Sequence, residues 1–541
     1  MPEQDLPVTL AAERRSLAEG QAPGAAASGR WRAVAGWPWV ALIPAAVTFA
    51  VTLYEISRPS FWQDEASTLA DTNRTLPQLF ALLGHIDAVH GAYYTLMWFV
   101  IRVAGTSELA VRFPSAVAMA VAAGGIGLLG KRLVSGRAGL AAGLVFAAIP
   151  QVSWYGQNAR EYALVTAVAT IASYLFVRAV QAFPDARRGS VNHWMIGYGV
   201  SLAALGLLNL FALLLIPAHG LALAAWARRD ATVPVRDADG SPADATTRLL
   251  ARNWLIAVLA ALVVCSPVAF FGWRERGQVA WIEGLDLHEL IGVEQLIGPS
   301  TVFTAALIVI AAGIAVSAAR GRSRLRADWP QRLVTLCVSW LILPPAVLLA
   351  VSLAHPVYLF RYIVFCIPAA ALLVGTALAA LGRAAGSLAL IVIVVLVLPA
   401  QAGVRGPTSH DNENLRAVSQ FVGDHAHRGD AVLFASSYER KIAIAYPAGF
   451  RTLRDISLGE SAIAAAEPAA SNAPTAVISR RLATVSRVWL IRREGLPEPV
   501  PPGEPPGFKQ ALPPLRKLGF RLAYSRAISK YLISLYVHRV G

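Results

Sequence analysis

The sequence is poor in charged residues and in cysteine for its length. Only 15% of its 541 residues are charged, whereas 56% are hydrophobic, and the mean hydropathy is +0.52. This hydrophobicity excludes a disordered chain, which needs a polar composition. Three cysteines are too few to staple a secreted disulfide scaffold, so we expect Cys265, Cys337 and Cys366 to be packed thiols. The composition indicates a polytopic membrane protein.

The sequence also lacks the short motifs of several enzyme classes. It contains no HExxH, P-loop, GxSxG or CxxC pattern, which argues against a zinc hydrolase, an ATPase, a serine hydrolase and a thiol redox enzyme. The net charge is +15, but most of the arginines interrupt hydrophobic segments instead of forming a basic face. We therefore expect the lipid bilayer, and no nucleic acid, as their partner.

Eleven apolar stretches come close to the roughly 20 residues with which a helix crosses a bilayer. Lysine and arginine gather in every second connection between them, which places the N-terminus on the cytoplasmic side of the plasma membrane. We predict an all-α polytopic membrane domain over 37–404, after a disordered cytoplasmic tail over 1–36. The predicted spans lie at about 37–56, 110–130, 138–152, 162–182, 193–208, 211–227, 254–271, 301–319, 332–353, 361–382 and 386–403.

The first external loop, from Ser57 to Leu109, is long enough to hold juxtamembrane helices. Its segment Gly91–Gly105 is apolar, but the roughly 14 residues between these glycines are too few for a hydrocarbon core about 30 Å thick. Counting the segment as a span would also move the basic loop Lys131–Arg137 outside, against the charge rule. We therefore predict an interfacial helix there.

From residue 405 onward the composition changes to that of a soluble α/β domain, over 405–541. The segments 430–437, 487–494 and 530–539 have the apolar and β-branched residues of strands. Asp411 is expected to cap a helix that carries its apolar residues on one face. Eleven spans after a cytoplasmic start place this domain on the extracytoplasmic side.

Two adjacent carboxylates, Asp64 and Glu65, directly follow the first span. Carboxylates at membrane depth are costly and therefore mark functional sites. In a helix the two side chains point about 100° apart, so one faces a cavity while the other caps or pairs. A carboxylate in this position can act as a general base toward a hydroxyl or bind a hard cation.

Polar residues gather again in two later external connections. They are Arg160, Glu161 and Tyr162 between the third and fourth spans, and Tyr358, Arg361 and Tyr362 between the ninth and tenth. Arg160 has two readings, as a donor to phosphate oxygens or as an anchor at the headgroups. An arginine flanked by tyrosines at the lipid boundary suits the phosphate of a lipid-linked donor, because a guanidinium can bind two phosphate oxygens at once.

The order of Asp64 and Glu65, QNAREYAL (157–164) and PVYLFRYIVFCIP (356–368) resembles bacterial relatives of the protein O-mannosyltransferases and the lipid A aminoarabinose transferase. These are C-type superfamily glycosyltransferases that use polyprenyl-phosphate sugars, and the resemblance covers Trp37 to Gly406. It implies that Asp64 is the catalytic base, and we place Glu65 beside it in the catalytic group. It also implies that the arginines of the other two segments contact the phosphate.

One loop departs from the family pattern. Relatives often carry a proline after the loop histidine, whereas this chain has Gly91 after His90. Two roles stay open for His90, a sugar or metal contact and a packed interfacial histidine. We assign no metal ligands and no cofactor, and a divalent cation at the carboxylates stays open.

These residues predict an inverting sugar transfer. We expect Asp64 to deprotonate an acceptor hydroxyl as it attacks the anomeric carbon of a polyprenyl-phosphate sugar, mannose in the first instance. The acceptor is a glycan, a glycolipid or a protein, which the C-terminal domain is expected to recognise. One alternative is an arabinosyltransferase of a cell-envelope glycan. Another is a transporter or flippase of a lipid-linked precursor, which would need polar groups near the bilayer midplane.

Overall fold

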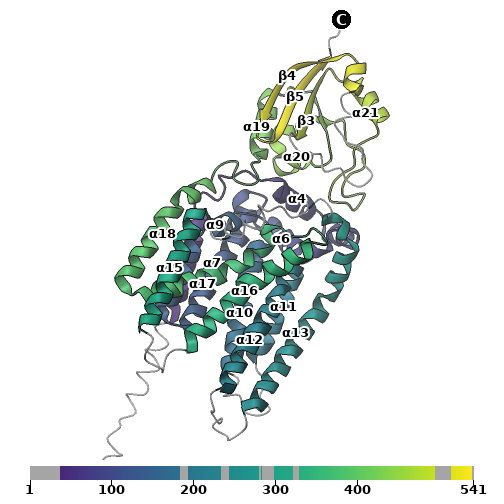
Figure 1. Ribbon diagram of the computed structural model, residues 1–541. Helices are drawn as coiled ribbons and strands as arrows, with labels where there is room; N and C mark the ends of the chain where they lie inside the picture. Colours follow the sequence, from purple (N-terminus) through teal and green to yellow (C-terminus); the bar gives the residue numbers. More distant parts are fainter. Residues whose placement is uncertain are drawn as a thin grey trace, which may run out of the picture.

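The computed structural model describes residues 37–182, 193–232, 243–279, 282, 296, 298–320, 328–493 and 513–538. The predicted cytoplasmic tail over 1–36 lies outside the described residues. The described chain consists of a helical bundle and a small C-terminal sheet that lies beyond one end of the bundle (Figure 1).

Every predicted span falls on a helix of the bundle. Among the described residues, eight helices are long and apolar enough to cross a membrane, and a ninth is formed if α8 and α9, which meet at 66°, count as one broken span. Two shorter apolar helices bring the described candidates to the predicted eleven. The helices are α3 (Trp37–Leu53), α7 (Glu108–Leu133), α8 (Gly136–Ala148), α9 (Pro150–Gly156), α10 (Tyr162–Ala182), α11 (His193–Leu208), α12 (Leu215–Thr232), α13 (Ala243–Arg274), α15 (Ser300–Arg320), α16 (Asp328–Ser352), α17 (Ile367–Leu381) and α18 (Arg383–Gly403).

Small residues allow the first helices of the bundle to approach one another closely. A Cβ atom on Gly127 of α7 would lie 2.1 Å from the carbonyl oxygen of Val40 in α3, and one on Gly139 of α8 would lie 2.1 Å from the carbonyl oxygen of Gly127. In lipid, where apolar helices gain little from leaving solvent, such close backbone packing is a main source of helix association. Larger residues at these two positions would force α3, α7 and α8 apart.

The segment between α3 and α7 folds into short helices at the end of the bundle nearest the C-terminal sheet (Figure 1). They are α4 (Gln63–Thr72), α5 (Leu76–His85), the 3-10 turn η1 (Ala88–His90) and α6 (Gly91–Ala104). Helix α6 has 14 residues, as the spacing of its glycines predicts, and Tyr93, Tyr94 and Met97 bury one of its faces. The short helices predicted for this loop are thus present in the structure.

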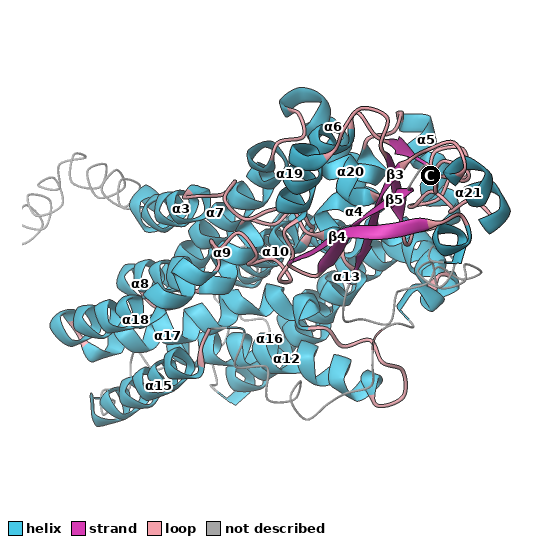
Figure 2. Cartoon of the chain, turned by 90° about the horizontal axis from the view of Figure 1, so that it is seen from above, coloured by secondary structure: helices cyan, strands magenta, loops and turns pink. Residues whose placement is uncertain are grey.

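The C-terminal sheet has five strands in the order β2-β1-β3-β5-β4. Strand β1 pairs in parallel with β2 and β3, whereas β5 pairs antiparallel with β3 and β4. Alternate residues of the strands face α19 and α20 on one side and α21 on the other, which gives two hydrophobic cores (Figure 2). The elements are α19 (Leu415–His425), β1 (Ala431–Phe434), α20 (Lys441–Ala445), β2 (Arg454–Asp455), α21 (Thr475–Leu482), β3 (Arg487–Arg493), β4 (Phe520–Ile528) and β5 (Tyr531–His538).

The predicted cap of α19 was wrong. Asn414 is the N-cap, and its side chain accepts a hydrogen bond of 3.0 Å from the backbone N–H of Ala417. Asp411 lies three positions earlier with φ +51°, and its carboxylate pairs with Arg493 and Lys530. The ion pairs with the sheet hold Asp411 outside the helix, so the nearer amide takes the capping position.

Candidate active site

Helix α4 places Asp64 and Glu65 in different environments. Glu65 is fully buried, and Arg112 of α7 donates to its Oε1 from Nε at 2.8 Å and to its Oε2 from Nη2 at 2.6 Å. The backbone N–H of Ala159 also donates to Oε1 at 2.8 Å. Both carboxylate oxygens are therefore held by protein donors. The two side chains diverge as predicted, and we now propose a structural role for Glu65 in place of the catalytic one.

Asp64 faces the 3-10 turn η5 (Phe360–Cys366), which precedes α17. Its Oδ2 lies 3.4 Å from Nη1 of Arg361, and both side chains are partly exposed, 30% for Asp64 and 24% for Arg361. A partly solvated ion pair at this distance is weak compared with a buried, bidentate one. Asp64 is thus an accessible carboxylate with one loose ionic contact.

The loop between α9 and α10 carries Arg160 to the same place. Its Nε lies 3.4 Å from Oε2 of Glu161, and both side chains are buried. Burial by itself would lower the pKa of Arg160, but the carboxylates of Glu161 and Asp64 outweigh this effect and raise the pKa well above its ordinary value. Arg160 is therefore a permanent buried cation within electrostatic range of Asp64.

Glu161 also faces His90, the residue that precedes α6. The distance from its Oε1 to Nδ1 of His90 is 3.8 Å, and the imidazole packs against the ring of Tyr94 at 5.5 Å between centroids. Among the described residues, neither Nδ1 of His90 nor Oε2 of Glu161 has a hydrogen-bond partner. Buried polar atoms usually have one, so this pair retains hydrogen-bonding capacity for a ligand next to Arg160.

The three predicted tyrosines separate into two groups. Tyr362 lies beside Arg361, whose guanidinium carbon is 5.9 Å from the ring centre, and Tyr162 interacts electrostatically with the same arginine. Tyr358 is buried in the hydrophobic core of the bundle, and its backbone N–H donates to Oγ of Ser352 at 2.8 Å. The structure therefore brings Tyr162 and Tyr362 to the site, whereas Tyr358 belongs to the hydrophobic core of the bundle.

Sequence reasoning missed a second charged cluster on α4. Asp71 lies two turns after Asp64 and is buried, with its Oδ1 3.7 Å from Nη2 of Arg74. Lys441 of α20 is also buried and donates to Oγ of Ser67 at 2.9 Å. Burial raises the pKa of Asp71 to about 7 and lowers that of Lys441. Lys441 is 374 positions away from Ser67 along the chain, so no local pattern could have linked them.

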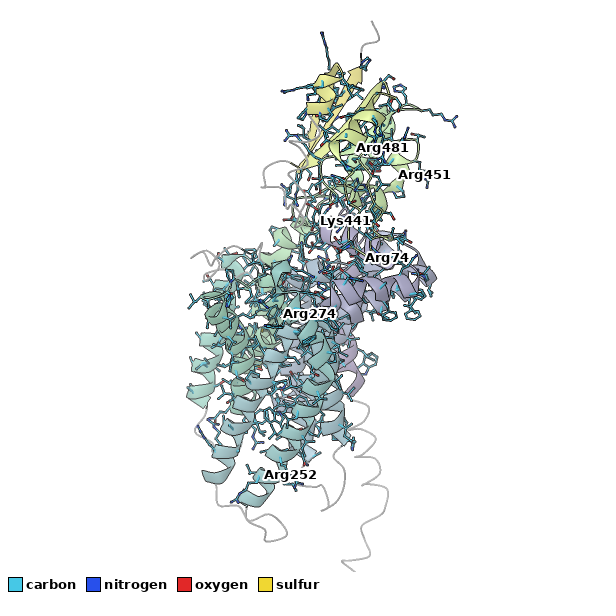
Figure 3. The ribbon with its side chains drawn as sticks, turned by 90° about the vertical axis from the view of Figure 1, so that its right-hand side faces the viewer. Arg74, Arg252, Arg274, Lys441, Arg451 and Arg481 are labelled. Atoms are coloured by element: carbon cyan, nitrogen blue, oxygen red, sulfur yellow. The ribbon has the colours of Figure 1, made fainter. Side chains whose placement is uncertain are left out.

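No group of three potential metal ligands occurs among the residues that the structure describes. A separate groove of about 620 Å³ lies between α11 and α13. Its lining is mostly apolar, from Met195 to Val264, and includes Arg252, at the end of the bundle remote from the C-terminal sheet (Figure 3). None of the site residues described above lines this groove.

Residues 91–235 match the family described as dolichyl-phosphate-mannose-protein mannosyltransferase. The structure of ArnT from Cupriavidus metallidurans in the apo state is similar over 93% of this chain and 98% of ArnT, with a TM-score of 0.57 and 13% identity. The chain therefore has the fold of ArnT. ArnT bound to undecaprenyl phosphate gives a TM-score of 0.54 at 14% identity, over 91% of this chain and 97% of ArnT.

The segment that matches the family contains Arg160, Glu161 and Tyr162. It begins at Gly91, directly after His90, and ends before η5. No curated protein matches the sequence at a significant level. The family match therefore covers the loop between α9 and α10. Asp64 and Arg361 lie outside the matched segment, and the fold brings them next to this loop.

Proposed function

We propose that this protein transfers a sugar, mannose in the first instance, from a polyprenyl-phosphate donor to an acceptor hydroxyl on the extracytoplasmic side. The observation that carries the proposal is the convergence of three residues from separate elements. The carboxylate of Asp64 is accessible and contacts Arg361, and Arg160 lies within electrostatic range of it. A general base beside two permanent cations is what a transfer from a phosphate leaving group requires.

The reaction is a single displacement in our proposal. Asp64 takes the proton of the acceptor hydroxyl while its oxygen attacks the anomeric carbon. The bond from this carbon to the phosphate oxygen breaks, and polyprenyl phosphate leaves with the electron pair. Because the phosphate is already a good leaving group, no general acid is needed, and one displacement inverts the anomeric centre.

Arg361 connects donor binding to activation of the base. The contact of 3.4 Å with Asp64 is loose, whereas a phosphate accepts two parallel hydrogen bonds from a guanidinium. The donor phosphate therefore competes with Asp64 for Arg361. When the phosphate binds Arg361, the carboxylate of Asp64 loses its contact with this arginine and can accept a proton from the acceptor hydroxyl.

The comparisons support this substrate class. ArnT has been determined with undecaprenyl phosphate, and the matching family is described by a dolichyl-phosphate mannose donor. Both are polyprenyl phosphates, whose head group needs cations at the membrane boundary. The choice of mannose rests on the family description, and the inward orientation of the N-terminus rests on the charge of the loops.

Two other functions make different predictions. An arabinosyltransferase would use the same base and the same cations with a pentose donor. A transporter or flippase needs polar groups near the middle of the membrane. There the bundle holds His219, which bonds Ser173 and Tyr198 at 3.1 Å each and is fully buried. These partners make His219 a packing residue, and this favours the enzyme.

The test uses the full-length protein in nanodiscs, with radiolabelled polyprenyl-phosphate mannose or arabinose and a membrane extract as acceptor source. We expect the mannose label to move to an acceptor and the arabinose label to stay on the lipid. Transfer of arabinose alone would support the pentosyltransferase. In a parallel assay with the protein reconstituted in closed vesicles, movement of intact labelled lipid across the membrane, without transfer, would overturn the proposal.

A further inference from the structure

Helix α4, which carries Asp64, is attached to the C-terminal region (the described residues from 405 onward). Its first backbone N–H, on Gln63, donates to Oε2 of Glu413 at 2.7 Å. The side-chain amide of Gln63 donates to the carbonyl oxygen of Tyr438 at 2.5 Å. Ala66 is fully buried in the same hydrophobic cluster as α19, α20 and the strands. One face of the helix is therefore part of the C-terminal core.

Glu413 supplies the cap that α4 lacks in its own sequence. Trp62 occupies the N-cap position, and its indole side chain cannot accept a hydrogen bond from the helix. Glu413 is fully buried and is held in place by Arg493 at 2.8 Å and by the hydroxyl of Tyr531 at 3.3 Å. A carboxylate at a helix N-terminus satisfies a free N–H and interacts favourably with the helix dipole. The position of α4 thus depends on a residue of the C-terminal region.

Lys441 makes the second attachment, next to the base. It donates to Ser67, which lies three positions after Asp64 and so on the same side of α4. Its side chain is 3% exposed and also interacts electrostatically with Asp64 and Asp71. Figure 3 shows Lys441 and Arg74 together at the junction of the bundle and the C-terminal region. A buried lysine is costly unless it is paired, so its place beside these carboxylates is well defined.

The opposite side of α4 is fixed to the bundle by the pair of Glu65 and Arg112. Asp64 therefore lies between one anchor in the membrane part and two anchors in the C-terminal region. We propose that Glu413 and Lys441 are positioning residues for Asp64, so that the C-terminal region forms part of the active site and does not serve acceptor recognition alone. This inference rests on the proposed function of Asp64.

The first test compares Glu413→Ala and Lys441→Met with wild type in the full-length protein, using donor hydrolysis and sugar transfer. A displacement of about 1 Å at a reacting group costs on the order of 100-fold in rate. We expect both variants to lose ten- to 100-fold in kcat in both assays, with the donor KM within a factor of two. Lys441→Arg, which keeps the charge and can still donate to Ser67, is expected to restore most of kcat.

Arg487→Met is the matched control, because Arg487 pairs with Asp430 at 2.8 Å inside the C-terminal region. It is expected to leave kcat unchanged. Wild-type kcat in Glu413→Ala and Lys441→Met would overturn the inference while leaving the proposed function standing. So would equal loss in Lys441→Arg and Lys441→Met. An inactive wild type would instead count against the proposed function.

A second measurement does not depend on activity. Hydrogen–deuterium exchange of the peptide that covers α4 should increase in Glu413→Ala and Lys441→Met, because local opening becomes easier when an anchor is removed. Exchange in Arg487→Met should match wild type. Unchanged exchange of α4 in both anchor variants would show that the C-terminal region does not hold the helix, and the inference would fail.

Discussion

Asp64 and Glu65 are neighbours in sequence with opposite environments. Glu65 has no exposed surface and receives three hydrogen bonds, whereas Asp64 is 30% exposed with one loose ionic contact. A carboxylate that must accept a proton needs access to the substrate and a free lone pair. Asp64 meets both conditions, whereas Glu65 is buried and out of reach of a substrate.

This difference predicts opposite phenotypes. Replacing Glu65 with Ala leaves the charge of Arg112 buried without its partner, which typically costs about 3–5 kcal/mol. We expect Glu65→Ala to lower the unfolding temperature of the detergent-solubilised protein markedly, whereas Asp64→Asn should unfold close to wild type. Similar unfolding temperatures for all three proteins would contradict the structural role of Glu65.

Substitutions of Arg361 give the sharpest test of whether the site binds the phosphate of the donor. If it binds two phosphate oxygens, Arg361→Lys should weaken donor use, because an ammonium cannot make the paired contact. Arg361→Ala should be worse, by about 2–5 kcal/mol in kcat/KM for a desolvated contact. An arginine that only reaches the headgroups could be replaced by lysine without loss. Unchanged donor affinity and turnover in Arg361→Lys would therefore remove Arg361 from phosphate binding.

The buried carboxyl of Asp71 predicts a pH-dependent stability. Its pKa rises from 3.8 to about 7 on folding, mainly because the carboxyl is buried. The positive charges of Lys441, Arg74 and Arg160 lower this pKa, whereas the negative charge of Asp87 raises it. The folded state therefore retains a proton that the unfolded state releases, so stability decreases as the pH rises from about 4 to 7 and is level above. The unfolding temperature of Asp71→Asn relative to wild type should rise over this range. A difference independent of pH would contradict the assignment.

At the scale of elements, the hydrophobicity of the sequence and the spacing of its charges were sufficient to predict the helices of the membrane part. Each apolar stretch became a helix because a chain in lipid must satisfy its own backbone hydrogen bonds. Of the five strands, β1, β3 and β5 fall within the predicted segments. Strand β4 was missed because most of its residues are exposed, as expected at a sheet edge, and β2 has only two residues.

The prediction that α6 lies on the membrane surface can be tested by labelling. Ala81 and Thr106 are exposed on either side of α6, and the three native cysteines are buried. Ala81→Cys and Thr106→Cys should both react with a membrane-impermeant maleimide added to intact cells. If α6 crossed the membrane, one of the two cysteines would react only after the cells are permeabilised, and the topology would have to be revised.

At the scale of the whole molecule, the site is built from residues far apart in sequence. Asp64 and Arg361 are separated by 297 positions, and both were predicted because each sits at the end of an apolar stretch. Glu413 and Lys441 were not predicted, because they lie in the C-terminal region and reach α4 only through tertiary packing. The division of the chain at residue 405 and the sides on which the termini lie stay predictions.

The measurement that tests the central claim most directly is sugar transfer by Asp64→Asn. Asparagine has nearly the same shape as aspartate but cannot accept the proton at neutral pH. In nanodiscs with labelled polyprenyl-phosphate sugar, we expect the variant to unfold like wild type, to bind the donor and to lose at least 100-fold in transfer rate, within the usual contribution of a general base. Transfer at the wild-type rate by a correctly folded Asp64→Asn protein would contradict the account.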